Sequence, residues 1–155
     1  MKTMRVLTTA AAAALVVATA GAAPAAAAAD LIFTKDQGEE ILSTFDGKPW
    51  WQMQAYCAGF HGATANYFDR QGERSRAKAA EAAGVDALNT AVRQLMRDRG
   101  VSAAEATKLA ESAVQVGGRT TAQALNQDGT ASFGQWNYWR SFCIDAKAAY
   151  VRAAR

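Results

Sequence analysis

The sequence contains few of the residues that mark specialised protein classes. Its 155 residues include two Cys, two Pro and one His. Two cysteines are too few for a small disulfide-dense scaffold, and two prolines without a glycine repeat exclude a collagen-like chain. Charged residues make up 20% and hydrophobic residues 50%, which is too apolar and too evenly charged for a disordered chain. The length fits one ordinary domain and is short for two.

Motifs that identify common catalytic and cofactor sites are also missing. The chain has no Gly-x-Ser-x-Gly elbow, phosphate-binding loop, His-Glu-x-x-His zinc motif or Cys-x-x-Cys-His haem attachment. We therefore expect no catalytic residue, no metal site and no cofactor, and we expect that the protein is not an enzyme.

The N-terminus has the pattern of a secretory signal peptide. Lys2 and Arg5 precede an apolar run, Val6–Ala20, and small residues follow up to Ala29. A positive start, a short apolar stretch and an Ala-x-Ala exit define such signals. The apolar run is short of the ~20 residues that a membrane-spanning helix needs. We expect cleavage after Ala29, with cleavage after Ala23 as the alternative.

Removal of residues 1–29 would leave residues 30–155 as a single helical domain with almost no net charge. The leader takes Lys2 and Arg5 from 17 basic residues and none from 14 acidic ones. Because nucleic-acid-binding proteins normally carry a marked basic excess, we expect no nucleic-acid partner. The leader predicts a periplasmic or secreted protein without a membrane span after cleavage.

The mature chain has recurring helix signals and no alternating run long enough to suggest a strand. A short helix is expected from about residue 35 to 45, and Pro49 suits the first turn of the helix that follows. The long helices are expected at about 50–71, 73–99, 102–127 and 132–154. Three pairs of Ser or Thr with Glu or Gln three residues later mark helix starts: Thr34/Gln37, Ser102/Glu105 and Ser132/Gln135. Glycines mark several ends: Gly47, Gly72, Gly100 and Gly129.

Apolar residues spaced three and four apart predict the buried face of each long helix. The first long helix has the stripe Trp50, Met53, Cys57, Phe60, Thr64 and Tyr67. The last has Trp136, Trp139, Cys143, Ala146, Tyr150 and Ala153, with Phe133, Ile144 and Val151 on a second side. The middle helices have weaker stripes: Val85, Leu88, Val92 and Leu95, then Ala106, Leu109, Ala113 and Val116. With short turns between helices, these stripes predict an all-α protein, an antiparallel four-helix bundle with a short extra N-terminal helix.

Cys57 and Cys143 lie on the facing stripes of the first and last long helices. These helices are adjacent in such a bundle, and an exported protein is expected to oxidise two cysteines placed in this way. The sequence therefore predicts a disulfide between them. Two free buried thiols are the alternative.

His61 follows Cys57 by four residues on nearly the same helix face. A metal site or a thiolate–base pair there would compete with the disulfide for Cys57, and no second histidine is present. We favour a partly buried, hydrogen-bonded histidine at the helix seam.

Trp51 and Tyr138 lie outside the predicted stripes. At 100° per residue around the helix axis, they are about 140° and 100° from the centre of their stripes. If both were exposed, they could bind a partner or a flat sugar face. We expect the short helix to cover Trp51. Together with His61, these two residues are the candidate binding residues of the sequence.

We expect a non-enzymatic exported protein that binds another envelope protein through its helix faces. The first alternative is a carrier of a small apolar ligand in a cavity lined by Met53, Phe60, Leu88 and Trp139. The second is a hydrolase that uses His61 with a carboxylate.

Overall fold

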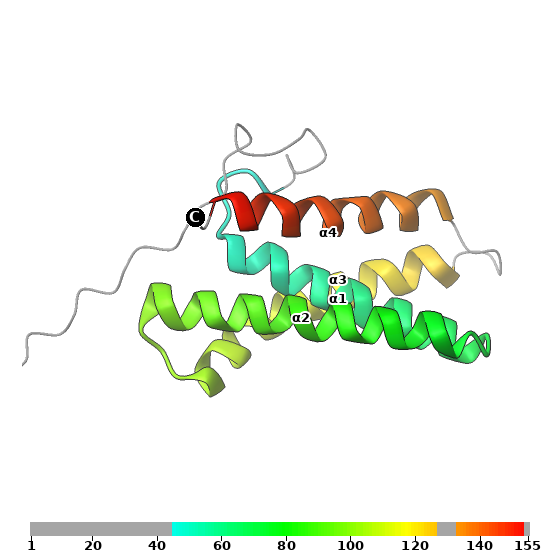
Figure 1. The fold of residues 1–155 in the computed structure, drawn as a ribbon, viewed down its shortest axis with the longest axis horizontal. Coiled ribbons are helices and arrows are strands. Elements are labelled where there is room, and N and C mark those ends of the chain that lie inside the picture. Colours follow the sequence, from blue (N-terminus) through cyan, green and yellow to red (C-terminus); the bar gives the residue numbers. More distant parts are fainter. Residues whose placement is uncertain (1–44, 127–132, 154–155) are drawn as a thin grey trace, which may run out of the picture.

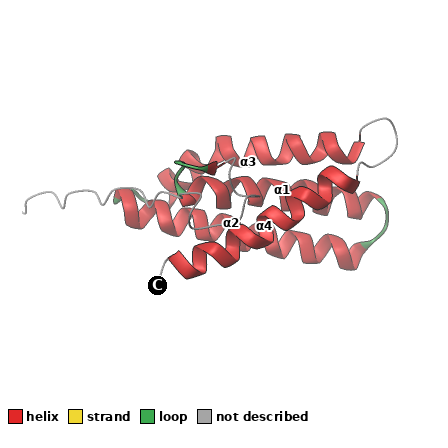
Figure 2. Ribbon diagram, turned by 90° about the horizontal axis from the view of Figure 1, so that it is seen from above, coloured by secondary structure: helices red, strands yellow, loops and turns green. Residues whose placement is uncertain are grey.

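The computed structural model describes residues 45–126 and 133–153, which form four helices that lie lengthwise alongside one another (Figures 1 and 2). The helices are α1 (Trp50–Arg70), α2 (Arg74–Arg99), α3 (Ala103–Asn126) and α4 (Phe133–Ala153). These described residues contain no strand, so the predicted all-α class is confirmed. None of their helices combines the length and apolar character needed to cross a bilayer.

The helix ends follow the local sequence signals. Gly72 and Gly100 have φ angles of 74° and 65°, a left-handed conformation that glycine adopts at low cost. At the start of α3, the Glu105 carboxylate accepts from the Ser102 backbone N–H at 3.0 Å, and the Ser102 hydroxyl accepts from the Glu105 N–H at 3.3 Å. This reciprocal pair is the predicted capping box. Pro49 is the N-cap of α1 rather than a residue of its first turn.

Several expectations fall outside the described residues. These are the signal peptide, the short helix before Phe45, and the capping boxes at Thr34 and Ser132. Phe45 itself is described, and it is buried in the main core cluster.

Helix α1 is the centre of the fold and contacts each of the other three helices. Its N-terminal half is buried on nearly every side, with Gln52 as the one partly exposed residue between Trp50 and Phe60. A helix that is buried all round belongs to the interior of a protein. The predicted stripe on α1 is confirmed from Trp50 to Thr64, while Tyr67 is partly exposed.

The predicted stripes on α2 and α3 are confirmed in part. Leu95, Ala106 and Ala113 are buried, and Leu88 and Val92 are partly buried, but Val85 is 56% exposed and Leu109 and Val116 are also exposed. Most of each buried face consists of small residues three and four apart: Ala77, Ala80, Gly84, Ala87 and Ala91 in α2, and Ala106, Ala110, Ala113, Gly117 and Thr121 in α3. Small side chains occupy these positions because they allow the backbones of α2 and α3 to approach α1 closely. Ile144 and Val151, expected on a second apolar side of α4, are exposed.

Helices α1 and α3 cross with their backbones in contact. A methyl group added at Gly59 would overlap the carbonyl oxygen of Val114, and one added at Gly117 would overlap that of Tyr56. On the other side of α1, a methyl group at Gly84 of α2 would lie 3.3 Å from the Ala58 carbonyl oxygen. Glycine is required at the α1–α3 crossing because any larger residue would push the helices apart.

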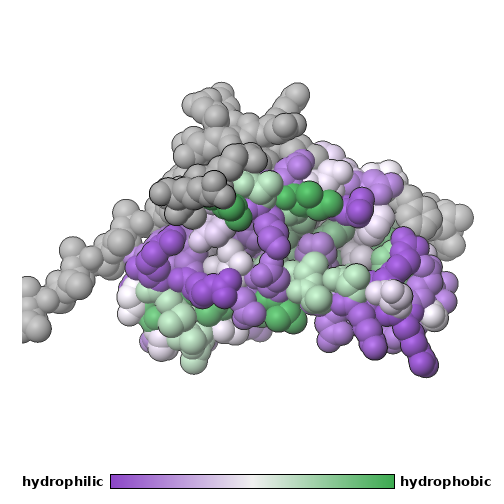
Figure 3. Space-filling model, in the orientation of Figure 1, coloured by the Kyte–Doolittle hydropathy of each residue, from purple (hydrophilic) through white to green (hydrophobic). Residues whose placement is uncertain are grey.

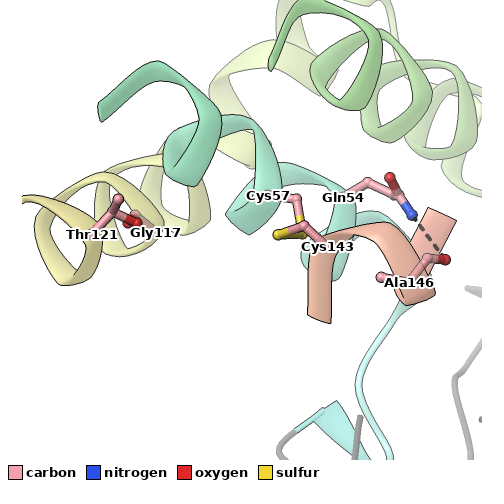
Figure 4. The surroundings of a disulfide bond; sticks show 6 residues. All are labelled: Gln54, Cys57, Gly117, Thr121, Cys143 and Ala146. Carbon is pink, nitrogen blue, oxygen red and sulfur yellow. Dashed lines mark hydrogen bonds between the residues drawn. A yellow bond between two sulfur atoms is a disulfide. The ribbon is translucent and has the colours of Figure 1, made fainter. Parts of the chain in front are cut away.

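The seam between α1 and α4 is covalent and hydrogen-bonded. Cys57 and Cys143 form the predicted disulfide, with Cα atoms 5.5 Å apart (Figure 4). One turn away, the Gln54 amide donates to the Ala146 carbonyl oxygen at 3.4 Å (Figure 4). Further along, the Trp136 indole N–H donates to the Thr64 hydroxyl at 3.1 Å, which satisfies both buried polar groups.

Candidate functional site

The C-terminal half of α1 has an open face between α2 and α3. Two adjoining hollows of about 590 and 400 Å³ lie along it, and both are lined by Ala58, Gly62 and Asn66 of α1 and by Val114 of α3. We call them together the α1 groove. It opens where α2 and α3 diverge, beyond the point where Trp51 and Leu95 fill the space between these helices.

The floor of the α1 groove is made of small residues and its rim is charged. Gly62 is exposed, and a methyl group added there would meet nothing within 4 Å. The rim carries both signs of charge: Asp69, Arg70, Arg74, Lys78 and Glu81. Such a surface attracts neither a strongly acidic nor a strongly basic ligand. Figure 3 shows hydrophilic surface with separate hydrophobic patches on the face in view.

A third hollow, of about 310 Å³, lies where α1, α3 and α4 meet beside the turn that precedes α1. We call it the aromatic pocket. Its aromatic wall consists of Phe45, Tyr56 and Trp139. The ring centroids of Tyr56 and Trp139 are 4.9 Å apart, and those of Phe45 and Tyr56 are 5.6 Å apart. The rest of the lining is aliphatic or polar: Lys48, Gln52, Ser112, Ala113, Val116 and Thr120.

Two polar groups of the aromatic wall are buried. The Trp139 indole N–H has no hydrogen-bond partner within the described residues. Burial raises the pKa of the Tyr56 phenol to about 12, and the neighbouring Thr120 hydroxyl offsets part of this effect. The Tyr56 hydroxyl lies close to that of Thr120 but makes no hydrogen bond with it or with another described residue. Both polar atoms are enclosed by protein atoms and are not accessible to solvent.

His61 lies on α1 near α2 and α4, away from the aromatic pocket. Burial, together with the smaller effect of the positive charges of Lys147 and Arg140, lowers its pKa to about 4. Its ring packs edge-on against Phe60, and it makes no hydrogen bond within the described residues, so the expected hydrogen bond is not found. Because the ring stays neutral near pH 7 and no carboxylate is among the causes of its shift, the geometry gives no support to a His–carboxylate pair.

The other two candidate binding residues occupy different surroundings. Trp51 is 9% exposed and packs among alanines of α2 and α3, so these helices cover it within the described structure. The guanidinium of Arg99 lies 5.3 Å from its ring centroid. Tyr138 is 42% exposed and packs edge-on against Trp139 with ring centroids 5.1 Å apart. It therefore lies next to the aromatic pocket, while Trp51 and His61 do not line it.

None of the three hollows described above is lined by all four residues predicted for an apolar-ligand cavity. Met53 and Phe60 are 0% and 1% exposed within the core. Leu88 borders the α1 groove and Trp139 the aromatic pocket, so the four residues do not line one common hollow. The sequence did not indicate Phe45 and Tyr56 as pocket residues. They line one hollow only because α3, α4 and the turn before α1 come together in the folded chain.

Within residues 45–126 and 133–153, no group of three or more His, Cys, Asp or Glu side chains is placed to hold a metal ion. Comparison of the chain with protein-family models, with curated proteins and with solved structures found no match.

Proposed function

We propose that the mature chain, residues 30–155, is an exported, non-enzymatic helical protein of the periplasm or cell exterior. We propose further that it forms an antiparallel four-helix bundle with a short N-terminal helix and binds another envelope protein through its helix faces. The buried disulfide supports export, because cytosolic thiols are kept reduced whereas exported proteins keep disulfides. The signal-like residues 1–29 point to the same compartment.

The observation that carries the binding proposal is the α1 groove. Helices α1, α2 and α3 already pack through small residues, and the groove continues the same kind of surface along the open face of α1. Amphipathic helices bind in grooves of this kind, with apolar side chains on the floor and charges at the rim. The partner helix would place aliphatic side chains over Ala58 and Gly62 and pair charges of both signs with the rim.

The test is site-specific photo-crosslinking in cells that export the chain. A photoreactive residue replaces Gly62 in the groove or, as a matched control, Gly134 on α4. Both glycines are exposed helical positions where an added methyl group meets nothing within 4 Å. We expect an envelope-protein adduct from position 62 and none from position 134. An absence of adducts at position 62, or the same adducts at both positions, would contradict the proposal.

A variant that fills the groove provides a second test, which does not depend on the yield of the crosslinking reaction. Gly62→Leu should fill the groove without disturbing the core, because open space surrounds the position. It should abolish binding of the crosslinked partner, whereas Gly134→Leu should leave that binding unchanged. Equal binding by the two variants would show that the partner contacts another face.

The aromatic pocket favours a second candidate function, the carrier of a small ligand. It is lined by residues of three helices, has an aromatic wall and lies at the small end of the volume range of ligand sites, about 300–1,000 Å³. The residues that would line it differ from those that the sequence indicated, with Trp139 in common.

A further inference from the structure

We propose that the aromatic pocket binds a small planar aromatic carboxylate. This inference rests on the carrier function and names its ligand class, and it is independent of the α1 groove. Two properties of the pocket carry it: a wall of aromatic rings, and a single charged residue, which is basic.

The walls favour a planar apolar body. Phe45, Tyr56 and Trp139 are already packed ring against ring, and Tyr138 adds an edge-on contact to Trp139 from outside. Aromatic rings in edge-on or offset contact stabilise one another beyond the effect of the area they bury. A volume of about 310 Å³ suits one or two fused rings. Val116 and Ala113 of α3 close the opposite side with aliphatic surface.

The lining provides hydrogen-bond donors for an oxygen atom of the ligand: the hydroxyl groups of Ser112 and Thr120 and the amide of Gln52. The indole N–H of Trp139 is enclosed by protein atoms and is not counted among them.

The charge of the pocket selects an anion. Lys48 is the only ionised residue among those that line it, and no Asp or Glu is among them. Its ammonium group lies 5.2 Å from the centroid of the Phe45 ring, so the positive charge is held at the aromatic wall. A carboxylate joined to a ring would place its oxygens near Lys48 while the ring contacts the aromatic wall. A neutral or cationic aromatic molecule would lack the first of these interactions.

The test uses the ¹⁵N-labelled mature chain and two probes of the same shape, 2-naphthoate and the neutral 2-naphthamide. The indole N–H resonances are followed by NMR, and the variant Trp139→Phe identifies the resonance of Trp139. We expect 2-naphthoate to shift the Trp139 resonance saturably. We expect 2-naphthamide to bind about tenfold more weakly, since the charged interaction is lost.

Two lysine variants separate a specific charge from the overall charge of the protein. Lys48→Met should weaken 2-naphthoate binding about tenfold and leave 2-naphthamide binding unchanged. Lys78→Met removes an equally exposed charge at the rim of the α1 groove and should leave both affinities unchanged. Because Lys48 is exposed, its replacement leaves the core and the disulfide intact.

Several results would overturn the inference. An unshifted Trp139 resonance at millimolar 2-naphthoate would show that the pocket does not bind this class. Equal affinities for the two probes, or equal effects of Lys48→Met and Lys78→Met, would show that the charge of Lys48 does not select the ligand. Crosslinking at position 62 tests the protein-binding function separately, so either proposal can fail without the other.

Discussion

Replacement of single helical glycines by alanine tests the central packing feature, the backbone contact between α1 and α3. Gly117, Gly84 and Gly62 are all inside helices, but a new methyl group meets a different environment at each. At Gly117 it overlaps the Tyr56 carbonyl oxygen and lies 3.2 Å from the Tyr56 Cα atom. At Gly84 it lies 3.3 Å from the Ala58 carbonyl oxygen, and at Gly62 it has no neighbour within 4 Å.

The structure sets the size and sign of each effect. Alanine is more favourable than glycine by about 1 kcal/mol in a helix interior, and this gain is common to all three variants. At Gly62 nothing opposes it, so the free energy of unfolding should rise by up to about 1 kcal/mol. At Gly117 only a shift of a whole helix relieves the overlap, which costs about 3 kcal/mol. After the gain in helix propensity, the free energy of unfolding should fall by about 2 kcal/mol. Gly84→Ala should fall between them, near zero.

The assay is urea denaturation of the oxidised mature chain, followed by circular dichroism at 222 nm. The comparison of Gly62→Ala with Gly117→Ala removes the shared helix propensity and leaves an expected difference of about 3 kcal/mol. If Gly117→Ala is as stable as Gly62→Ala, the two backbones do not touch and the description of the α1–α3 crossing is wrong. An unchanged m value would show that both variants still unfold from a compact native state.

Two further predictions concern the disulfide and the histidine. Replacement of Cys57 and Cys143 by alanine opens a loop with a sequence separation of 86 residues and should lower the free energy of unfolding by about 4.5 kcal/mol. Urea denaturation measures this loss, and a loss below about 1 kcal/mol, or two thiols that alkylate in the untreated protein, would contradict the bond. Because the pKa of His61 is about 4 when folded and ~6.5 when unfolded, the unfolded chain binds the proton first as the pH falls. Stability should therefore decrease from pH 7.5 to pH 4, by at most about 3 kcal/mol, and then stop responding to this group. His61→Gln should remove the part of that slope between pH 7 and pH 5, since the chain has no other histidine; an unchanged slope would show that the ring is already accessible to water.

The sequence indicated the elements of the fold with good accuracy because their signals are local. The turn glycines Gly72 and Gly100 and the Ser102/Glu105 pair act within one turn of the residues they affect. The pairing of Cys57 with Cys143 was also predictable, since large side chains dominate the stripes on which both residues lie and so fix those helix faces.

The buried faces of α2 and α3 were predicted wrongly at three positions, Val85, Leu109 and Val116, because hydrophobicity was weighed above size. Val85 and Val116 are more apolar than alanine, yet they point outward while alanine and glycine face α1. A single helix pattern cannot show that the partner helix approaches at backbone contact. That distance depends on both helices at once, here on Gly59 and Gly117 together with the residues opposite them.

The sequence alone determined that this chain is helical, where most of its helices begin and end, and which two cysteines are joined. These features could be predicted because capping, turn geometry and amphipathic spacing act over a few residues. Only the tertiary structure decided that α1 lies at the centre, that Trp51 is covered by α2 and α3, and that Phe45, Tyr56 and Trp139 line one pocket. These arrangements depend on distances between helices that are far apart in the chain. Such distances are set by the smallest side chains at each crossing rather than by the most apolar ones.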